Sequence, residues 1–446
     1  MRKIHIVTFG CQMNKLDSEL AGEALADAGH LMVTDEQAAD TVIFNTCSVR
    51  DHAEQRVLSR LAQLKPRHDA DPDFRLGIMG CFAEREGGEL LARLPYLDFA
   101  LGTRQFPRLP EVLAELDTGR GKTGRFGPDE TESPGIHHSH PRSRHQGIHG
   151  FVSVMRGCDN RCTYCIVPDV RGGETSRPPE EIAAEVKALA LAGAREITLL
   201  GQNIDAYGKH DGHSLAGLLR LIDRAAPPET GLARIRFVTS HPRDITRELV
   251  ETVAELGRVC RHFHMPAQSG SDPVLKAMHR GYTRAEYDGK LAMIREIIPD
   301  ADIASDFIVG FPGETEADYL ATRELVAGAD YQNSYIFKYS PRPGTPSAET
   351  MVDDVPDAEK KRRNNDLLAV QNEVGARRAA AMPGRRLEVL VEGVSSRDAR
   401  RWTGRSAGNM ICVFDAPPEG EDWTGSLIRV EVDTATPLTL YCHRIN

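Results

Sequence analysis

Three cysteines lie within eight residues of one another in the segment 158–165, which reads Cys-Asp-Asn-Arg-Cys-Thr-Tyr-Cys. Thiolates at this C-x3-C-x2-C spacing can bind one face of a metal centre, because a single loop carries all three sulfurs. A structural zinc site or an electron-transfer cluster needs a fourth soft ligand nearby, and the next cysteine, Cys260, is far along the chain. The triplet Cys158, Cys162 and Cys165 therefore favours a [4Fe-4S] cluster with one open iron, where a small molecule binds.

This spacing, with Tyr164 directly before the third cysteine, resembles the signature of the radical S-adenosylmethionine (SAM) superfamily. The resemblance implies that the open iron binds the amino and carboxylate groups of SAM. It also implies that an electron from the cluster cleaves SAM to give a 5′-deoxyadenosyl radical. A zinc knuckle or an electron-transfer cluster is the alternative, although both usually fill the fourth position with a protein ligand.

Three further cysteines each follow a predicted strand in the first hundred residues. Cys11, Cys47 and Cys81 come after the predicted strands 3–9, 41–45 and 75–79, and the predicted helices 18–28 and 53–64 separate these strands. Alternating strands and helices indicate a parallel sheet, whose carboxyl ends lie at one edge. The three thiols are therefore expected to meet there as ligands of a second, auxiliary cluster. Small buried cysteines in turns are the alternative, since free cysteine packs well.

The order of the two cysteine triplets resembles the methylthiotransferase family of radical SAM enzymes, over essentially the whole chain. The segments 8–14 (TFGCQMN) and 45–50 (NTCSVR) are most similar to the members that convert N(6)-dimethylallyladenosine beside the anticodon of tRNA to its 2-methylthio form. The resemblance implies two [4Fe-4S] clusters and two SAM molecules in each turnover. One SAM methylates sulfur on the auxiliary cluster, and the other supplies the radical that activates carbon 2 of the adenine.

Two other functions stay open on the sequence alone. A sister methylthiotransferase would modify threonylcarbamoyladenosine in tRNA or an aspartate of a ribosomal protein, and a non-catalytic iron–sulfur protein would only bind RNA. We expect a monomer with a tRNA substrate. The sequence identifies neither the sulfur donor nor the electron donor, and we assign no catalytic residue beyond the cluster ligands.

Strand and helix patterns alternate six times beyond residue 148. The predicted strands are 151–155, 196–200, 234–239, 259–264, 302–309 and 334–339, and the predicted helices between them include 179–192, 215–225, 246–256 and 316–327. Six βα units are too few to close an eight-stranded barrel. We therefore expect an open-sided (β/α)6 barrel, which is also the architecture of the radical SAM core.

Polar or glycine-rich segments follow four of these strands, and the carboxyl ends of barrel strands carry the active site. By resemblance, the tail after the second strand holds the methionyl amino group of SAM, and the segment 308–314 flanks its adenine. The expected cofactor contacts are Tyr164, Gly201, Gln202, Gln268, Ile308 and Gly310. Ordinary turn chemistry of Gly and Pro is the alternative. The segment 171–177 either contacts SAM or RNA phosphate or caps the next helix.

The segment beyond Pro383 has the pattern of a small all-β barrel. The predicted strands 387–393, 410–414, 426–432 and 438–442 fit an OB-like fold that binds RNA, and they resemble the TRAM domain of the family. Arg400, Arg401, Trp402, Arg405 and Asn409 are the candidates for RNA contact. Residues 360–405 contain twelve Lys and Arg against five Asp and Glu. A local positive excess in a chain of net charge −10 indicates a polyanion footprint, with a solvated helix face as the alternative for 360–363.

These patterns predict an α/β multidomain protein. Residues 1–116 form the domain of the auxiliary cluster, 117–147 a flexible linker, 148–376 the radical SAM core and 377–446 the RNA-binding barrel. The linker contains the histidine-rich run 137–145, which could bind metal, but a solvated linker is preferred because nothing fixes the imidazoles. No run of eighteen apolar residues is present, and the start resembles a strand rather than a signal peptide. We expect a cytoplasmic protein whose nine cysteines are reduced thiols or metal ligands.

Overall fold

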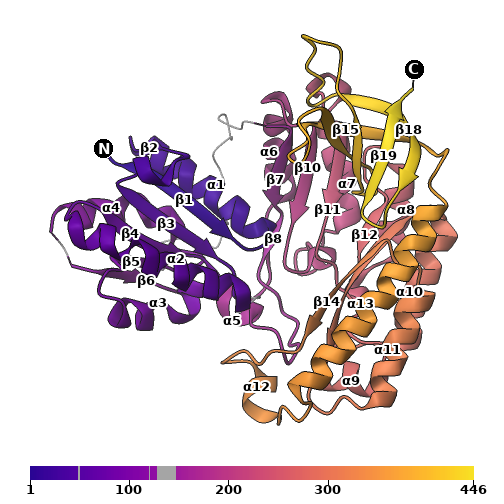
Figure 1. Cartoon of the computed structure of the whole chain (residues 1–446), viewed down its shortest axis with the longest axis horizontal. Coiled ribbons are helices and arrows are strands. Elements are labelled where there is room, and N and C mark those ends of the chain that lie inside the picture. Colours follow the sequence, from indigo (N-terminus) through magenta and orange to yellow (C-terminus); the bar gives the residue numbers. More distant parts are fainter. Residues whose placement is uncertain (49–50, 120, 128–146, 446) are drawn as a thin grey trace. The chain divides into compact units, whose positions relative to one another are not determined.

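The computed structural model describes residues 1–48, 51–119, 121–127 and 147–445. The chain divides into two compact units (Figure 1). Unit 1 comprises residues 1–140, 155–159 and 165–177, and unit 2 comprises residues 141–154, 160–164 and 178–446. Residues 158, 159 and 165 of the cluster loop belong to unit 1, and residues 160–164 belong to unit 2.

Unit 1 contains a six-stranded sheet in which every pairing is parallel, in the order β2-β1-β3-β4-β5-β6. The strands are β1 (Lys3–Phe9), β2 (Leu31–Met32), β3 (Thr41–Thr46), β4 (Arg75–Met79), β5 (Phe99–Leu101) and β6 (Thr123–Arg125). This sheet confirms the predicted N-terminal fold. β6 falls inside the segment expected to be a linker and nevertheless pairs with β5. The expected linker residues 128–146, with the histidine-rich run, lie outside the described residues.

Helices cover both faces of this sheet. They are α1 (Gln12–Asp27), η1 (Glu36–Ala38), α2 (Asp51–Ala70), α3 (Cys81–Arg93), η2 (Phe106–Arg108) and α4 (Leu109–Asp117). One core joins α1 and α4 to side chains such as Ile43, and the other joins α2 and α3 to Val42 and Phe44. Because successive residues of β3 enter opposite cores, the strand is buried along its whole length.

The second part of unit 1 follows the segment expected to be a linker. It consists of β8 (Met155–Arg156), α5 (Val167–Arg171) and β9 (Thr175–Ser176), and β8 and β9 pair antiparallel. The predicted strand 151–155 therefore ends early, because Met155 belongs to a different sheet from residues 149–153. The cluster loop lies between β8 and α5.

Unit 2 begins with two three-stranded parallel sheets, in the orders β11-β10-β7 and β12-β13-β14. The strands are β7 (His149–Ser153), β10 (Glu196–Leu200), β11 (Arg234–Phe237), β12 (His262–His264), β13 (Asp302–Val309) and β14 (Asn333–Lys338). A single bridge between Ile235 and Val259 joins the two sheets, so the six strands follow one another in chain order. This arrangement confirms the predicted six-stranded, open-sided barrel.

Helices follow the strands of this partial barrel. They are α6 (Pro179–Leu191), η3 (Ile204–Ala206), α7 (Leu215–Ala225), η4 (Pro228–Thr230), η5 (Pro242–Asp244), α8 (Arg247–Glu255), α9 (Asp272–Ala277), α10 (Arg284–Ile297), α11 (Glu316–Gly328), α12 (Pro346–Thr350) and α13 (Asp357–Ala380). The long helix α13 packs against α11 and β14 (Figure 1). It runs without a break across residue 376, the expected end of the core.

The C-terminal part of unit 2 is a closed barrel in the order β15-β16-β17-β19-β18. Its strands are β15 (Arg386–Val394), β16 (Arg401–Ser406), β17 (Ile411–Asp415), β18 (Leu427–Ala435) and β19 (Thr439–Arg444). The closed barrel confirms the predicted small all-β fold. The strand β16 was absent from the prediction, because its sequence Arg-Trp-Thr-Gly-Arg-Ser has few apolar residues.

Arginine side chains of β11 attach this barrel to the base of the parallel sheet. Arg234 donates to the carbonyl oxygens of Arg405 and Glu388 at 2.6 and 2.9 Å. Arg236 donates to the carbonyl oxygens of Ala407 and Ser406 at 2.6 and 2.8 Å. Both guanidinium groups are buried, so each must find acceptors within the protein.

A partly buried ion cluster lies beside this attachment. Glu196 pairs with Arg236 at 2.8 Å and with His149 at 3.5 Å, and His149 also contacts Glu392 of the barrel at 3.2 Å. Burial alone would lower the pKa of His149, but hydrogen bonds to the two glutamates raise it to about 9. The cluster therefore holds His149 in its charged form at neutral pH.

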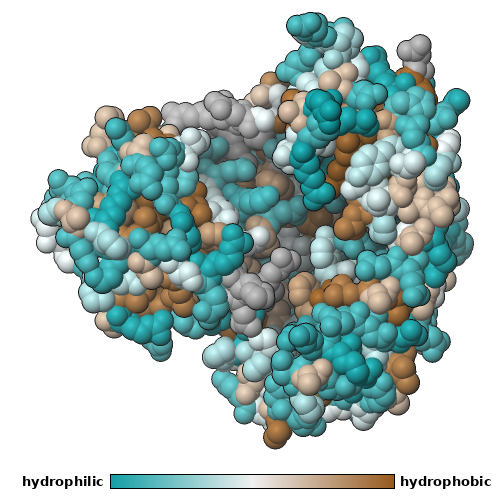
Figure 2. All heavy atoms as spheres, viewed as in Figure 1, coloured by the Kyte–Doolittle hydropathy of each residue, from teal (hydrophilic) through white to brown (hydrophobic). Residues whose placement is uncertain are grey.

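The visible surface is mostly hydrophilic, with hydrophobic side chains in scattered patches (Figure 2). Within the part of the chain that the structure describes, every helix is too short or too polar to span a lipid bilayer.

Candidate functional site: two cysteine centres

The three N-terminal cysteines lie at the carboxyl ends of three neighbouring strands. β3 pairs with β1 on one side and with β4 on the other, and the register places Phe9 beside Thr46 and Asn45 beside Met79. Cys11, Cys47 and Cys81 each follow these strand ends by one or two residues. The structure therefore brings the three predicted ligands to one edge of the sheet.

Two glycines and two asparagines shape this edge. Gly10 and Gly80 have φ angles of 156° and 94°, and a Cβ at Gly10 would lie 2.8 Å from the Cβ of Cys47. A Cβ at Gly80 would overlap Oδ1 of Asn45. Asn45 and the buried Asn14 hydrogen-bond to each other twice, at 2.9 and 2.8 Å. Side chains larger than hydrogen at either glycine would displace the cysteine loops.

The three thiols have different environments. Cys11 is exposed, whereas Cys47 and Cys81 are buried. A hydrogen bond with Cys47 lowers the pKa of the Cys11 thiol to about 6, and the positive charge of Arg171 also lowers it. Burial raises the pKa of Cys81, and Arg171 opposes that rise. Deprotonated cysteines are the form that binds iron, so a nearby cation favours metal binding.

Arg171, the last residue of α5, contacts this site directly. Its Nε donates to the sulfur of Cys81 at 3.3 Å, and its Nη1 lies 2.8 Å from the buried carboxylate of Asp17. The side chain of Thr103 and that of Arg104 hold the end of α5 through the carbonyl oxygens of Val170 and Arg171, at 2.6 and 3.1 Å. The sequence left open whether residues 171–177 contact SAM or RNA phosphate or cap the next helix, and in the structure Arg171 contacts the sulfur of Cys81.

The residues at this edge fit an iron–sulfur cluster. They provide three thiols, one of them exposed, and a buried guanidinium whose Nη2 has no hydrogen-bond partner among the described residues. A buried unpaired donor is costly for a protein, so it indicates an acceptor that the polypeptide does not supply. Cluster sulfurs are acceptors of this kind.

The second triplet lies on the loop between β8 and α5. Cys158 and Cys165 belong to unit 1 and are half-buried, and Cys158 donates its backbone N–H to the carbonyl oxygen of Gly172 at 3.0 Å. Cys162 belongs to unit 2 and is buried. There the loop is held by Thr163, whose backbone N–H donates to the carbonyl oxygen of Met278 at 3.1 Å.

A second buried arginine, Arg280, contacts this triplet. Its Nη1 donates to the sulfur of Cys162 at 3.3 Å and to the hydroxyl of Tyr164 at 3.4 Å. Its other nitrogens donate to the hydroxyl of Tyr282 and the carbonyl oxygen of Pro266, both at 3.1 Å. Arg280 was not predicted, since a lone arginine in a turn carries no sequence signal. Its contacts with a thiol and Tyr164 fit a cluster with negative charge at this loop.

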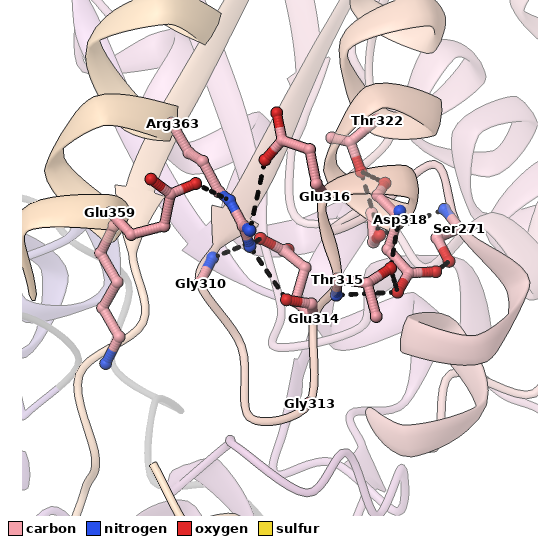
Figure 3. Close-up of polar contacts among 12 residues, drawn as sticks. Ser271, Gly310, Gly313, Glu314, Thr315, Glu316, Asp318, Thr322, Glu359 and Arg363 are labelled. Carbon is pink, nitrogen blue, oxygen red and sulfur yellow. Dashed lines mark hydrogen bonds and ion pairs between the residues drawn. The ribbon is translucent and has the colours of Figure 1, made fainter. Parts of the chain in front are cut away.

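The expected adenine segment is ordered by a buried ion pair. Gly310 adopts a φ of 72°, and its backbone N–H donates to Glu314 at 2.8 Å (Figure 3). Arg363 of α13 donates to the same carboxylate at 2.7 Å and to the carbonyl oxygen of Glu314 at 3.0 Å. The backbone N–H of Ile308 donates to the carbonyl oxygen of Gln268 at 2.9 Å, so these three expected SAM contacts lie at one edge of the sheet.

The tail of β10 contains two further expected SAM contacts. Gly201 is buried and Gln202 is half-buried, directly after the strand. Two further titratable side chains lie near these strand ends: Asp205 on η3, which the sequence analysis did not single out, and His241 before η5, in the polar segment that follows the third strand. Burial raises the pKa of Asp205 to about 7, and burial lowers that of His241 to about 2. These polar side chains lie within ten residues of strand ends, which is the only signal that the sequence offered for them.

The five RNA candidates on the barrel have different surroundings, and Asn409 accepts a hydrogen bond from Arg405 at 3.2 Å. Arg400 is exposed and pairs with Asp398, whereas Arg401 and Arg405 are half-buried and pair with Asp415 and Glu392. Trp402 is only 9% exposed and packs in the barrel core with Val391, Phe414 and other apolar residues. The expectation that Trp402 contacts RNA was therefore wrong, because its ring lies inside the barrel rather than on a strand face.

The basic start of α13 also differs from the prediction. Lys360 and Arg363 are each 5% exposed, and they pair with Asp353 at 2.5 Å and Glu314 at 2.7 Å. These two residues therefore form neither a surface that binds a polyanion nor a solvated helix face. Their charges pair with carboxylates inside the fold.

Two family models match the chain. The radical SAM superfamily matches residues 152–326, and uncharacterized protein family UPF0004 matches residues 3–102. The chain is 43% identical over 434 residues to a tRNA-2-methylthio-N(6)-dimethylallyladenosine synthase of Moorella thermoacetica, with 96% of this chain and 95% of the relative covered. Proteins of the same name from Ralstonia nicotianae and Chromobacterium violaceum are 42% and 40% identical, with 99% of this chain and 97% and 98% of those relatives covered.

Among solved structures, the radical S-adenosylmethionine methyltransferase TsrM of Kitasatospora setae has a similar fold. The TM-score is 0.56 at 16% identity, and the match covers 78% of this chain and 77% of that chain. At this identity the likeness concerns the fold alone.

Proposed function

The chain belongs to the family of tRNA-2-methylthio-N(6)-dimethylallyladenosine synthases, and on that premise we propose that it replaces the hydrogen on carbon 2 of N(6)-dimethylallyladenosine in tRNA with a methylthio group. Membership in this family confirms the predicted radical SAM methylthiotransferase, with [4Fe-4S] clusters and SAM as cofactors. The observation that carries the proposal is the meeting of three strand-end thiols beside a buried arginine, in a chain that also has the radical SAM triplet.

Six cysteines would hold the two clusters. Cys11, Cys47 and Cys81 would bind the auxiliary cluster, and Cys158, Cys162 and Cys165 the radical SAM cluster. When bound, the clusters and SAM supply a carbon radical strong enough to activate an aromatic C–H bond, together with the sulfur and the methyl group of the product.

The side chains around these cysteines prepare the sites. Arg280 and Arg171 each place an N–H group on a thiol and counter its negative charge. The tail with Gly201 and Gln202, together with Tyr164, Gln268, Ile308 and Gly310, would bind SAM. Glu314 accepts the backbone N–H of Gly310 and would thereby fix this turn of the loop.

The tRNA substrate would be bound by the C-terminal barrel. Arg400 is 89% exposed along its side chain, and Arg401 and Arg405 are each 34% exposed, so all three guanidinium groups can exchange a carboxylate partner for a phosphate. The modified adenosine would be the one beside the anticodon. Because the proposed substrate is tRNA, we propose that the protein acts in the cytoplasm, and that it acts as a monomer.

Nucleoside mass spectrometry of bulk tRNA tests the proposal. Cells that lack this protein should accumulate N(6)-dimethylallyladenosine, and the wild-type chain should restore its 2-methylthio form. A chain with Cys→Ala at any of the six positions should not restore the 2-methylthio form. The Cys260→Ala chain, changed at a buried cysteine outside both triplets, should restore it fully. A 2-methylthio product of threonylcarbamoyladenosine, or a modified ribosomal aspartate, would show a sister activity instead.

Cleavage of SAM by the purified, reduced protein separates the two centres. Alanine at Cys11, Cys47 or Cys81 should leave formation of 5′-deoxyadenosine intact, and alanine at Cys158, Cys162 or Cys165 should stop it. Continued cleavage in the Cys162→Ala protein contradicts the assignment of the radical SAM ligands. A wild-type protein that cleaves no SAM would be a non-catalytic RNA-binding protein.

A further inference from the structure

Arg171 is an unusual residue for the auxiliary centre because it is almost fully buried and only partly paired. The side chain is 4% exposed. Nε donates to the sulfur of Cys81 at 3.3 Å, and Nη1 lies 2.8 Å from Asp17, whose side chain is 2% exposed. Nη2 is buried and has no hydrogen-bond partner among the residues that the structure describes.

The planar guanidinium fixes where the unpaired donor points. Nε and Nη2 share one edge of the group, and an N–H of each points in the same direction, as in bidentate arginine pairs. Because Nε donates to Cys81, the N–H of Nη2 is directed to the same side as the thiol. An acceptor there would satisfy a donor that is otherwise costly to bury.

Arg280 shows that this geometry is specific to the auxiliary centre. It too donates to a cysteine at 3.3 Å, but its remaining nitrogens are bonded to Tyr282 and the carbonyl oxygen of Pro266. Within the described residues, each nitrogen of Arg280 therefore has a hydrogen-bond partner, and one of them donates to sulfur. In Arg171, by contrast, Nη2, which lies on the same edge as Nε, has no such partner.

We propose that Arg171 is a positioning residue that donates two parallel N–H···S bonds to the auxiliary cluster, one to the Cys81 thiolate and one to an inorganic sulfide of the cluster. This inference rests on the proposed function, in which Cys81 is a cluster ligand. Hydrogen bonds to cluster sulfurs and a buried positive charge stabilise the reduced, more negative cluster, and both raise its reduction potential. Arg171 thus keeps the auxiliary cluster easier to reduce than the three thiolates alone would.

Arg171 is close in the sequence to the radical SAM triplet. It lies at the end of α5, six residues after Cys165. Thr103 and Arg104 bind the backbone of this helix end, so the guanidinium is held by the same segment that follows the radical SAM triplet. Within unit 1, a short, anchored helix therefore connects Cys165 to the arginine at Cys81.

A redox titration followed by electron paramagnetic resonance tests the proposal. The full-length protein carries Cys162→Ala, so that the auxiliary cluster is the one observed, and neither tRNA nor SAM is present. Arg171→Gln should shift the reduction equilibrium at least tenfold toward the oxidised cluster, which for one electron is about 59 mV more negative. Arg104→Gln is the matched control, because it removes a charge from the same helix end, and among the residues that the structure describes Arg104 donates only to the carbonyl oxygen of Arg171.

Arg171→Lys separates the effect of the two parallel N–H groups from the effect of the positive charge. Lysine keeps the positive charge but cannot present two parallel N–H groups, so the potential should also fall, by less than in Arg171→Gln. Pulsed measurements of the reduced cluster after exchange into D2O should show deuterons coupled to the cluster, and the coupling should be lost in Arg171→Gln.

The reduction potentials of these variants test the proposal. Equal potentials in Arg171→Gln and Arg104→Gln would overturn the proposal. If the Arg171→Gln protein loses its iron, the reduction potential of the Arg171→Lys protein tests the proposal. A wild-type potential in the Arg171→Lys protein would refute the paired N–H···S bonds. Failure of this test leaves the tRNA product assay unaffected, whereas absence of any auxiliary cluster in the Cys162→Ala protein counts against the proposed function itself.

Discussion

Replacement of Arg363 by methionine should loosen the loop at Gly310. The guanidinium and the Glu314 carboxylate lie 2.7 Å apart, with side chains 6% and 1% exposed. Removing one partner of a buried ion pair leaves an uncompensated charge and typically costs about 3–5 kcal/mol. Burial already raises the pKa of Glu314 against the Gly310 N–H and Arg363, so loss of the arginine should raise it further.

The neighbouring Arg362 provides a matched control. Its guanidinium lies over the same ring as that of Arg363, Tyr319, at 5.5 Å against 5.6 Å, but its side chain is 48% exposed. Exposed pairs contribute at most about 1 kcal/mol, so Arg362→Met should change little. The two substitutions remove the same atoms from adjacent positions of α13 and differ mainly in burial.

Hydrogen–deuterium exchange of residues 310–318 measures the difference. Since about 1.4 kcal/mol is a factor of ten, Arg363→Met should speed exchange of the protected amides by about two to three and a half orders of magnitude. SAM binding should weaken in the same variant. In the double variant with Glu314→Gln, part of the protection should return, because no buried charge is left unpaired. Equal exchange in the Arg363→Met and Arg362→Met proteins would refute this account.

Three further predictions concern other parts of the fold. His149, whose pKa two glutamates raise to about 9, should stabilise the fold fully below its ordinary pKa of about 6.5 and lose that contribution as pH rises through 9. The melting temperature of His149→Gln should therefore fall less steeply between these pH values than that of the wild type, and parallel curves would contradict the assignment. Gly80→Ala should lower the iron content, whereas Gly119→Ala, at a similar positive φ with nothing within 4 Å, should leave it unchanged. Cys260→Ala should retain about eight irons per chain by colorimetric assay, and a lower value would make that cysteine a ligand.

Much of this architecture follows from local sequence patterns. β1, β4, β10 and β13 begin and end at the predicted residues, because β-branched and apolar runs are bounded there by polar or glycine residues. The cysteines at the ends of β1, β3 and β4 were predicted to meet, since neighbouring parallel strands share one edge. Helix α1, however, begins at Gln12 rather than Ser18, because the backbone N–H of Cys11 is capped by Asn14.

The errors arise where burial depends on partners distant in the chain. Lys360 and Arg363 look like a basic surface, yet their carboxylate partners Asp353 and Glu314 allow both to be buried. Trp402 follows two arginines and looks like an RNA contact, but strand alternation turns its ring into the barrel. Arg280 gave no signal, because its approach to Cys162 spans 118 residues of sequence.

The C-terminal barrel is attached to β11 through its backbone. Arg234 and Arg236 bind carbonyl oxygens of the barrel, which every amino acid presents alike. Side chains at those barrel positions can therefore change without altering the acceptors that the core recognises. Substitutions of exposed side chains on the barrel should therefore leave its hydrogen bonds to β11 intact, so that the surface of the barrel can be changed while its attachment stays the same.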